Sequence, residues 1–328
     1  MINRRQFSLT AAVALAVATT LAAPHALAQT YPGKPVRLVI PFPPGGATDI
    51  FGRVLAQKLG ELVGQQVVVE NRPGAGGTIG SDMVAKAAPD GYTILLATTS
   101  THSIGPALNP KMPYDAKKDF APVIHMADAT NILIASPTLP VNNLKELIAH
   151  AKANPGKLNF ASSGNGTIVH LTGEQFKAAT GTFIVHIPYK GTALSIPDLI
   201  AGQVAFVFDN IASALPHIRG GKVKTLGISA LKRSPLVPDI PTMDEAGLKG
   251  FESNTYFGVF AAPGTPAPII QRLNAEINKA LQAADFRERL GALGAEPVGG
   301  TPEQLARAVA RDTEKYAAVI KRAGIKPD

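Results

Sequence analysis

Short apolar runs rich in β-branched residues alternate with amphipathic helical stretches along most of this 328-residue chain, and turns of glycine and small polar residues join them. Residues 36–40 fit a buried strand that ends at the following prolines, because proline donates no ladder hydrogen bond. A helix is expected from about residue 47. This alternation is typical of α/β proteins, so we predict an α/β fold with mostly parallel sheets flanked by helices.

The alternation continues along the chain and includes two clear helix-start signals. Asn143 with Glu146, and Thr301 with Gln304, match the capping-box spacing and predict helices that begin at these points. Residues 105–119 are expected to be irregular. Further strands are predicted at 66–70, 93–97, 123–126, 131–135, 158–161, 184–187, 204–208, 225–229 and 255–260.

The turn at Gly45 and Gly46 is a candidate anion site. A strand end, two glycines that allow close backbone approach, and a helix start together direct unpaired N–H groups at one point. The alternative is an ordinary connection in which glycine only satisfies the geometry of the turn. This stretch alone does not separate the two interpretations.

A second turn of small residues, SSGNGT at 162–167, also joins a predicted strand to a predicted helix. In open α/β sheets, ligands bind beyond the carboxyl ends of the strands. Two lobes that face each other there would present two helix N-termini across a cleft, which suits a small molecule with two carboxylates. Six to eight hydrogen bonds of about 1.5–3 kcal/mol each exceed the roughly 8 kcal/mol of micromolar binding, so an arginine clamp is not required.

Residues 1–28 are predicted to be a signal peptide. A basic start is followed by an apolar segment too short to span a bilayer, and Ala26-Leu27-Ala28 matches an A-x-A cleavage site. Export through the Sec route and export through the twin-arginine route both remain open. We expect a soluble periplasmic protein that begins at Gln29.

The sequence lacks the signatures of several enzyme and cofactor classes. There is no cysteine, and no complete dinucleotide fingerprint, P-loop, G-x-S-x-G elbow or H-E-x-x-H helix. The seven histidines show no metal-ligand spacing. The net charge of +8 favours anionic partners, but the basic residues are scattered and no nucleic-acid motif is present. We therefore expect no cofactor, no metal site and no nucleic-acid partner.

Asp49 and Asp209 could in principle form an acid–base pair, because both follow strand ends. An aspartate in the first turn of a helix more often interacts with backbone N–H groups and the helix dipole. An exported α/β enzyme that uses one of these carboxylates as a base therefore stays open as an alternative to a binding protein.

Nine stretches of the chain, in order, resemble one family. They are YPGKPVR at 31–37, PFPPGGATD at 41–49, VENRPGAGG at 69–77, APDGY at 88–92, KDFAP at 118–122, FASSGNGT at 160–167, PYKG at 188–191, FDN at 208–210 and LGAEPVGGT at 293–301. With these motifs the chain resembles the Bug-type extracytoplasmic solute receptors, the substrate-binding component of tripartite tricarboxylate transporters. Gly105 and Asn109 depart from the pattern of the family.

The resemblance implies a two-lobed periplasmic-binding-protein fold, or Venus flytrap, that closes on a ligand. Lobe I would comprise residues 29–127 and 254–328, and lobe II residues 128–253. A monomeric receptor would bind a small carboxylate without catalysis and deliver it to integral-membrane transporter subunits. A receptor that reports to a membrane sensor kinase would need the same clamshell and remains an alternative.

The resemblance also implies a set of ligand-binding residues on the two sides of the cleft, where backbone N–H groups, hydroxyls and water hold the carboxylate. They are Phe42, Gly45, Gly46, Ala47, Thr48, Asp49, Thr98, Thr99, Ser100, Ser162, Ser163, Gly164, Thr167, Tyr189 and Asp209. Asp209 could receive an ammonium group of the ligand or only cap the following helix.

Overall fold

The structure is a computed structural model that describes residues 31–325, and the residues from Lys34 onward form one compact unit. The predicted signal peptide, residues 1–28, lies outside the described residues. None of the helices in the described part of the chain is long and apolar enough to cross a membrane.

Ten strands form a continuous mixed sheet in the order β2-β1-β3-β9-β4-β7-β5-β6, with β10 and β8 also paired to β4. The strands are β1 (Val36–Ile40), β2 (Val67–Asn71), β3 (Thr93–Thr98), β4 (Ala121–Ala135), β5 (Asn159–Ser162), β6 (Val185–Pro188), β7 (Phe206–Asn210), β8 (Lys224–Ile228), β9 (Asn254–Ala261) and β10 (Ala295–Pro297).

The helices cover this sheet. They are α2 (Ala47–Val63), α3 (Thr78–Ala85), α4 (Gly105–Leu108), α5 (Leu144–Ala153), α6 (Ile168–Thr180), α7 (Ile196–Ile200), α8 (Ile211–Arg219), α9 (Ala267–Gln282), α10 (Ala284–Ala292) and α11 (Pro302–Ala323). Three shorter turns are η1 (Ala75–Gly77), η2 (Ser100–Ile104) and η3 (Thr192–Leu194).

The fifteen-residue strand β4 joins two halves of the sheet. Its residues up to Thr130 pair with β9, and its residues from Asn131 onward pair with β7 and β8. We call the half with β1, β2, β3, β9, β10 and the start of β4 lobe I, and the half with β5–β8 and the end of β4 lobe II. The sequence analysis predicted two separate strands, at 123–126 and 131–135. This was wrong, because the polar residues between them continue the same extended strand from one lobe to the other.

The α/β prediction is confirmed, and the structure adds detail to the expectation of mostly parallel sheets. The outer strands of each lobe pair in parallel: β1 with β2 and β3, and β5 with β6 and β7. The pairs that involve β4 are antiparallel, as is the pair of β3 with β9. The sheet is therefore mixed, and the expectation of mostly parallel strands holds for the outer strands of each lobe but not for the central strands β4 and β9, which pair antiparallel.

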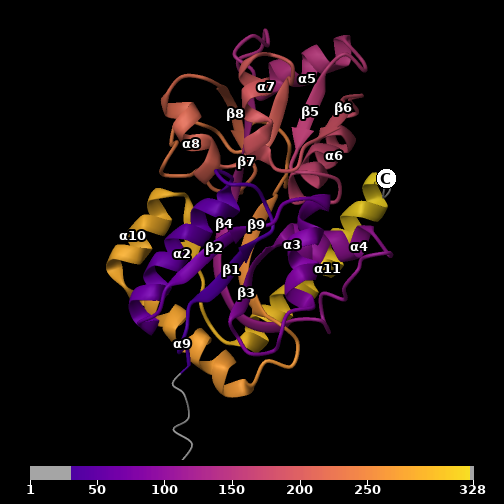
Figure 1. Cartoon of the computed structure of the whole chain (residues 1–328). Helices are drawn as coiled ribbons and strands as arrows, with labels where there is room; N and C mark the ends of the chain where they lie inside the picture. The colour runs from indigo at the N-terminus through magenta and orange to yellow at the C-terminus, as the bar shows by residue number, and fades with distance from the viewer. Residues whose placement is uncertain (1–30, 326–328) are drawn as a thin grey trace, which may run out of the picture. The chain divides into compact units, whose positions relative to one another are not determined.

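In lobe I, α2, α9 and α10 pack together on one side of the sheet, and α3, α4 and α11 lie on the other (Figure 1). Helix α11 contributes to both lobes. Its residues Leu305 and Val309 belong to the core of lobe I, whereas Tyr316, Val319 and Ile320 pack into the larger core of lobe II. The C-terminal helix therefore links the two lobes in addition to β4 and β9.

Both capping predictions are confirmed. The Thr301 hydroxyl accepts a hydrogen bond from the Gln304 N–H, and the Gln304 side chain accepts one from the Thr301 N–H at 2.7 Å. The Asn143 side chain accepts from the Glu146 N–H at 2.9 Å. These contacts satisfy N–H groups that have no intrahelical acceptor, which fixes where α11 and α5 begin.

The chain after β3 forms the π-helical turn η2, for which no helix was predicted, and continues into the short helix α4. The prediction of an irregular segment at 105–119 is therefore wrong at Gly105–Leu108, whereas residues 109–119 contain no helix or strand. All five residues of η2 are buried, and the Tyr114 hydroxyl donates to the Thr101 carbonyl at 2.9 Å from the loop beyond. Single π-helical turns are often found at functional sites. This one begins next to Thr98, at the end of β3.

Candidate functional site

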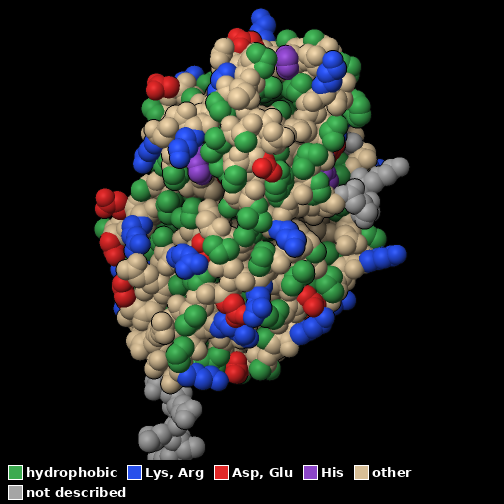
Figure 2. Space-filling model, turned by 45° about the horizontal axis from the view of Figure 1, so that its top comes forward, with side chains coloured by type: hydrophobic (Ala, Val, Ile, Leu, Met, Phe, Trp, Pro, Cys, Tyr) green, Lys and Arg blue, Asp and Glu red, His purple; other side chains and the backbone are tan. Residues whose placement is uncertain are grey.

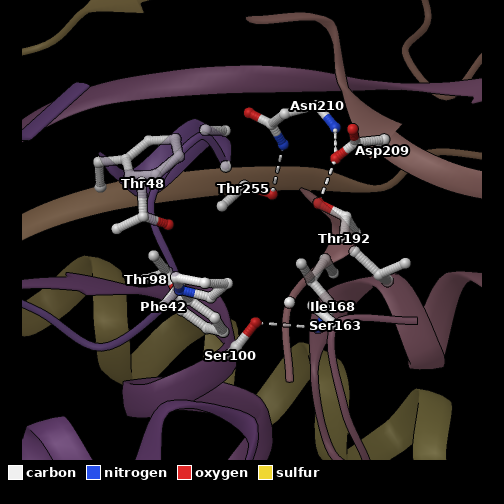
Figure 3. A pocket seen from close by; sticks show the side chains of 16 residues that line it. Phe42, Thr48, Thr98, Ser100, Ser163, Ile168, Thr192, Asp209, Asn210 and Thr255 are labelled. Atoms are coloured by element: carbon white, nitrogen blue, oxygen red, sulfur yellow. Dashed lines mark hydrogen bonds between the residues drawn. The ribbon is translucent and has the colours of Figure 1, made fainter. Parts of the chain in front are cut away.

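A cavity lies between the lobes, where the carboxyl ends of β1, β3, β5 and β7 meet. Its volume of about 50 Å³ accommodates several water-sized groups. The lining residues are Phe42, Pro43, Gly46, Ala47, Thr48, Thr98, Ser100, Ser163, Ile168, Val169, Gly191, Thr192, Asp209, Asn210, Thr255 and Phe257. Figure 3 shows Thr48, Phe42, Thr98 and Ser100 on one side and Thr192 and Asp209 on the other.

The turn after β1 forms the lobe I wall. Gly45 has a φ of +83°, which favours glycine, and Gly46 is extended as the N-cap of α2. The first hydrogen bond of the helix runs from the Ile50 N–H to the Gly46 carbonyl at 3.0 Å. The N–H groups of Ala47 and Thr48 therefore have no acceptor within the helix and lie at the cavity. The N-terminus of a 17-residue helix with free N–H groups is suited to bind an anion.

Asp49 does not line the cavity but supports this turn from behind. Its side chain accepts hydrogen bonds from the Gly45 N–H at 3.0 Å, from Arg53 at 3.0 Å and from Asn71 at 2.9 Å. Burial acts to raise the pKa of Asp49, but these hydrogen bonds outweigh burial and hold the pKa below its usual value. An ionised carboxylate with three donors is a weak base, so Asp49 acts here as a structural group.

The end of β3 contributes hydroxyl groups from lobe I. Thr98 and Ser100 line the cavity, and the Thr98 hydroxyl is buried with no hydrogen-bond partner among the described residues. Thr99 is turned away, because its hydroxyl accepts the Tyr256 N–H at 2.9 Å. Two of the three residues predicted at 98–100 therefore reach the cavity, and the third positions β9.

The predicted lobe II turn at 162–167 uses most of its donors within the protein. The Gly164 N–H donates to the Ser162 hydroxyl, and the Gly166 N–H donates to His170. At the start of α6, the Thr167 hydroxyl accepts the His170 N–H. Ser163 lines the cavity, whereas Ser162, Gly164 and Thr167 lie behind it. The two turns are therefore not equivalent, because only the one at Gly46 leaves a group of N–H donors free.

One hydrogen bond at the cavity joins the lobes directly. The Ile168 N–H, in the first turn of α6, donates to the Ser100 hydroxyl at 3.0 Å, as the dashed line in Figure 3 marks. Ser100 is in lobe I and Ile168 is in lobe II. In this structure the two lobes are therefore in direct contact across the cleft.

Glycines make further contacts between the lobes. A Cβ atom at Gly191 would lie 2.4 Å from ring carbons of Pro43, and one at Gly76 would lie 2.7 Å from the Asn165 carbonyl oxygen. Real Cβ contacts are essentially never below 3.0 Å. The backbone of Gly191 is extended, so only the lack of space, and not its conformation, requires glycine there. These glycines allow the loops of the two lobes to touch.

The end of β7 forms the opposite wall. Asp209 is 2% exposed, and its Oδ1 accepts hydrogen bonds from the Thr192 hydroxyl and from the Asn210 N–H, both at 2.8 Å. The Asn210 side chain donates to Asn131 and to the Thr255 hydroxyl. These contacts anchor the wall to β4 and β9 at the point where β4 changes partners.

The cavity has few charged residues in its lining, which is unusual for an anion site. Among the described residues that line it, Asp209 is the only ionisable one, and none is lysine, arginine or histidine. Burial raises the pKa of Asp209, against the opposing effects of the hydrogen bonds from Thr192 and the Asn210 N–H and of the nearby Ser213 hydroxyl and His217. No group of histidine, aspartate and glutamate in the described chain could hold a metal ion. Any anion here is bound by neutral donors.

Eight of the fifteen predicted residues line the cavity, and seven lie around it. Tyr189 is among the seven. Its hydroxyl donates a hydrogen bond to Asp198, with a distance of 2.5 Å between the two oxygen atoms, outside the cavity lining. The prediction missed Gly191, Thr192 and Asn210, which belong to or directly follow the PYKG and FDN motifs. It also missed Thr255 and Phe257 on β9. Those two carried no local signal, because they lie within an apolar strand that enters the cleft only through the tertiary fold.

Comparison with known proteins finds a matching family model and similar sequences. A family model described as "Tripartite tricarboxylate transporter family receptor" matches residues 51–325. The protein BugT of Bordetella pertussis is 41% identical over 319 residues, which are 97% of this chain and 98% of that protein.

Solved structures of similar proteins share the fold. The periplasmic binding protein BugD is 40% identical with a TM-score of 0.88, and the alignment covers 91% of this chain and all of that chain. The protein Rpa4515 of R. palustris with adipate is 37% identical with a TM-score of 0.89 and the same coverage. The protein MatC of Rhodopseudomonas palustris with bound malate is 36% identical with a TM-score of 0.84, covering 88% of this chain and all of that chain.

Proposed function

Because the chain belongs to the tripartite tricarboxylate transporter receptor family, we propose that it captures a small carboxylate between its lobes and delivers it to integral-membrane transporter subunits. One observation carries the proposal: the free N-terminal N–H groups of α2 lie at an interlobe cavity. Two relatives were solved with adipate and with malate, which are small carboxylates. Relatives of this kind are binding proteins, and this chain binds its ligand without converting it.

The proposed binding mode assigns the fifteen residues to two roles. Direct contacts come from Phe42, Gly46, Ala47, Thr48, Thr98, Ser100, Ser163 and Asp209, which line the cavity. Positioning comes from Gly45, Asp49, Thr99, Ser162, Gly164, Thr167 and Tyr189, whose backbone or side-chain hydrogen bonds hold the turns and strands behind it. The ligand carboxylate accepts from the N–H groups of Ala47 and Thr48. Hydrogen bonds to a charged acceptor contribute about 1.5–3 kcal/mol each.

The proposed lobes are residues 29–127 with 254–328, and residues 128–253. Two observations support these boundaries: β4 exchanges β9 for β7 and β8 after Thr130, and β9 begins at Asn254. Bending at these two strands would separate Ser100 from the α6 N-terminus and open the cleft. Helix α11, which packs on both lobes, limits how far they separate.

The protein is proposed to act as a monomer in the periplasm, after removal of residues 1–28 as a signal peptide. On the face drawn in Figure 2, basic and acidic side chains are interspersed rather than gathered by sign, which gives nucleic acid no basic stripe to bind. The ligand is therefore expected to be a small molecule. Specific recognition by membrane subunits would use the surface that changes when the lobes close.

Calorimetric titration with mono-, di- and tricarboxylates, aromatic acids and acidic amino acids tests the proposal. Native mass spectrometry of the purified protein, before any ligand is added, would show a carboxylate that remains bound from the cell. We expect saturable binding in the micromolar range to at least one class. The absence of binding across all classes would remove the basis for a carboxylate receptor.

A further inference from the structure

Asp209 presents a buried carboxyl group at the lobe II wall with only one of its two oxygens engaged. Its Oδ1 accepts from Thr192 and from the Asn210 N–H, whereas its Oδ2 has no hydrogen-bond partner among the described residues. The nearby Ser213 hydroxyl donates to the Asn210 carbonyl at 3.1 Å. We infer that Asp209 receives a hydrogen-bond donor of the ligand, so the ligand is a carboxylate that also carries a hydroxyl or an ammonium group.

The two walls of the cavity differ in hydrogen-bonding character. The lobe I wall supplies donors, namely the N–H groups at the start of α2 and the unpartnered hydroxyl of Thr98. The lobe II wall carries donors at the Ser163 hydroxyl and the Val169 N–H, but it also supplies an unpartnered carboxylate oxygen at Asp209. The Thr192 hydroxyl uses its own hydrogen on Asp209, so it can only accept from a ligand. A ligand with an acceptor at one end and a donor at the other matches both walls.

A ligand without a donor would meet two penalties at this wall. A buried acceptor without a partner costs free energy, because it has lost its hydrogen bonds to water. An ionised Asp209 would also repel a second carboxylate of the ligand, and no lysine, arginine or histidine among the described lining residues could offset this. A donor on the ligand removes the first penalty, and an ammonium group also removes the second.

The burial of Asp209 also favours a ligand that carries a hydrogen-bond donor. Asp209 is almost fully buried and its pKa is raised, because burial disfavours the ionised form of the carboxyl group. A donor that lies against Oδ2 would favour its ionised form. Charge-assisted hydrogen bonds of this kind commonly change affinity by ten- to a hundredfold.

The inference rests on the proposed function, since it assumes that a carboxylate binds at α2. Calorimetry on the wild-type protein with matched ligands tests the inference and the proposed function separately. Succinate, malate and aspartate share one carbon skeleton: succinate carries no donor, malate carries a hydroxyl, and aspartate carries an ammonium group. Propionate, lactate and alanine, and glutarate, 2-hydroxyglutarate and glutamate, form two further series. On the skeleton that fits, we expect at least tenfold tighter binding of a donor-bearing member. Comparing the affinities of the hydroxy acid and the amino acid in each series identifies which donor is recognised.

Substitution of Asp209 assigns the preference to this residue. Asp209→Asn keeps the size of the side chain and an oxygen acceptor but removes the charge, and Asp239→Asn removes the same charge from an exposed position in lobe II. We expect Asp209→Asn to lower affinity for an ammonium ligand at least tenfold and for a hydroxy acid less, with the donor-free ligand unchanged or tighter. Asp239→Asn should behave as the wild type.

Three outcomes are decisive. If the donor-free acid binds the wild type as tightly as its hydroxy and amino counterparts, the donor site is wrong while carboxylate binding stands. A preference for the donor-bearing ligand that survives undiminished in Asp209→Asn also contradicts it. If no acid of these series binds, and no tricarboxylate, aromatic acid or longer dicarboxylate binds either, the proposed function itself fails. The wild-type comparison needs no variant, so it decides the question even if Asp209→Asn does not fold.

Discussion

At the scale of single residues, two aspartates beside the same cavity have opposite environments. Asp49 accepts three hydrogen bonds behind the Gly45 turn, and its pKa is lowered. Asp209 lies at the cavity wall with one oxygen unpartnered, and its pKa is raised by burial. The structure thus gives different surroundings to the two residues that the sequence allowed as an acid–base pair: Asp49 holds the turn, and Asp209 lines the cavity.

Asp49→Ala tests the supporting role. The change leaves the Gly45 N–H and Asn71 without their carboxylate acceptor, so we expect a loss of about 1–3 kcal/mol in the free energy of unfolding and about a tenfold loss of ligand affinity. Urea denaturation and calorimetry measure the two effects. Asp239→Ala, at an exposed position whose side chain makes no hydrogen bond within the described chain, is the control. Unchanged affinity in Asp49→Ala would show that the turn keeps its shape without this side chain.

His102 makes the stability of the fold sensitive to acid. It is fully buried among Tyr114, Phe120 and Phe260, and burial lowers its pKa to about 3. In the unfolded chain its pKa is near 6.5, so the unfolded state takes up a proton first as the pH falls. The contribution of His102 to stability is therefore complete above pH 6.5 and declines between pH 6.5 and pH 3, by up to about 1.4 kcal/mol per pH unit.

Urea denaturation at pH 7, 6, 5 and 4 measures this dependence. His102→Phe keeps an aromatic ring in the cluster but cannot take up a proton, so its stability should fall less steeply than that of the wild type. The same change at His150, which is partly exposed on α5, is the matched control, because it removes a histidine and keeps His102 in place. Parallel curves for His102→Phe and the wild type would disprove the assignment.

Residue-scale prediction from sequence worked where a motif places the backbone. Gly46 and Thr48 belong to a turn in which two glycines follow a strand and precede a helix, and this local geometry already exposes N–H groups. Thr255 and Phe257 could not be found in this way, because a residue in a central strand reaches a cleft only through its neighbours in the sheet. The roles of Thr99 and Tyr189 depended on distant partners, Tyr256 and Asp198, that no local pattern identifies.

At the scale of elements, the interlobe contacts depend on close backbone approach. Gly191 lies against the ring of Pro43, so Gly191→Ala would place a methyl group 2.4 Å from that ring and hold the lobes apart. We expect at least a tenfold loss of ligand affinity, with the fold retained because the backbone at Gly191 is extended. Calorimetry and thermal denaturation measure the two effects.

Gly291→Ala provides the matched control for this closure test. Gly291 lies in α10, has no positive φ, and a Cβ atom there would have no neighbour within 4 Å. The control should bind ligand as the wild type does. Wild-type affinity in Gly191→Ala would show that the contact with Pro43 is not part of the ligand-bound state.

Element prediction from sequence succeeded where periodicity and caps agree, as at α5 and α11. It failed at β4, where a polar stretch between two apolar runs looked like a connection. That stretch is strand because β9 pairs with it along its length. The π-helical turn η2 was also missed, since its residues carry no helical periodicity and its geometry is set by burial against α4 and α11.

At the scale of the whole molecule, the described structure joins two lobes through β4, β9 and α11, with the cavity at their meeting point. The α/β class followed from alternation alone, and the two-lobed arrangement came from the family resemblance. Which strands would pair across the lobes could not be read from sequence, because long-range antiparallel pairing of β4 and β9 has no local signature. The direct contact between the lobes likewise depends on long-range pairs such as Ser100 with Ile168.

The central claim is that a carboxylate binds against the N-terminus of α2, and Gly46→Val tests it most directly. Gly46 has an ordinary φ of −79°, and a Cβ atom there would come no closer than 3.7 Å to the rest of the chain, so the fold accepts a side chain that enters the cavity. Gly46→Ala is the matched control, since alanine and valine are similarly poor N-caps but differ in bulk.

The decisive measurement is calorimetric titration of the wild type, Gly46→Ala and Gly46→Val with the same carboxylate. The account predicts that affinity falls with side-chain bulk and is lost in Gly46→Val, while both variants melt at similar temperatures. Wild-type affinity in a folded Gly46→Val protein would contradict it.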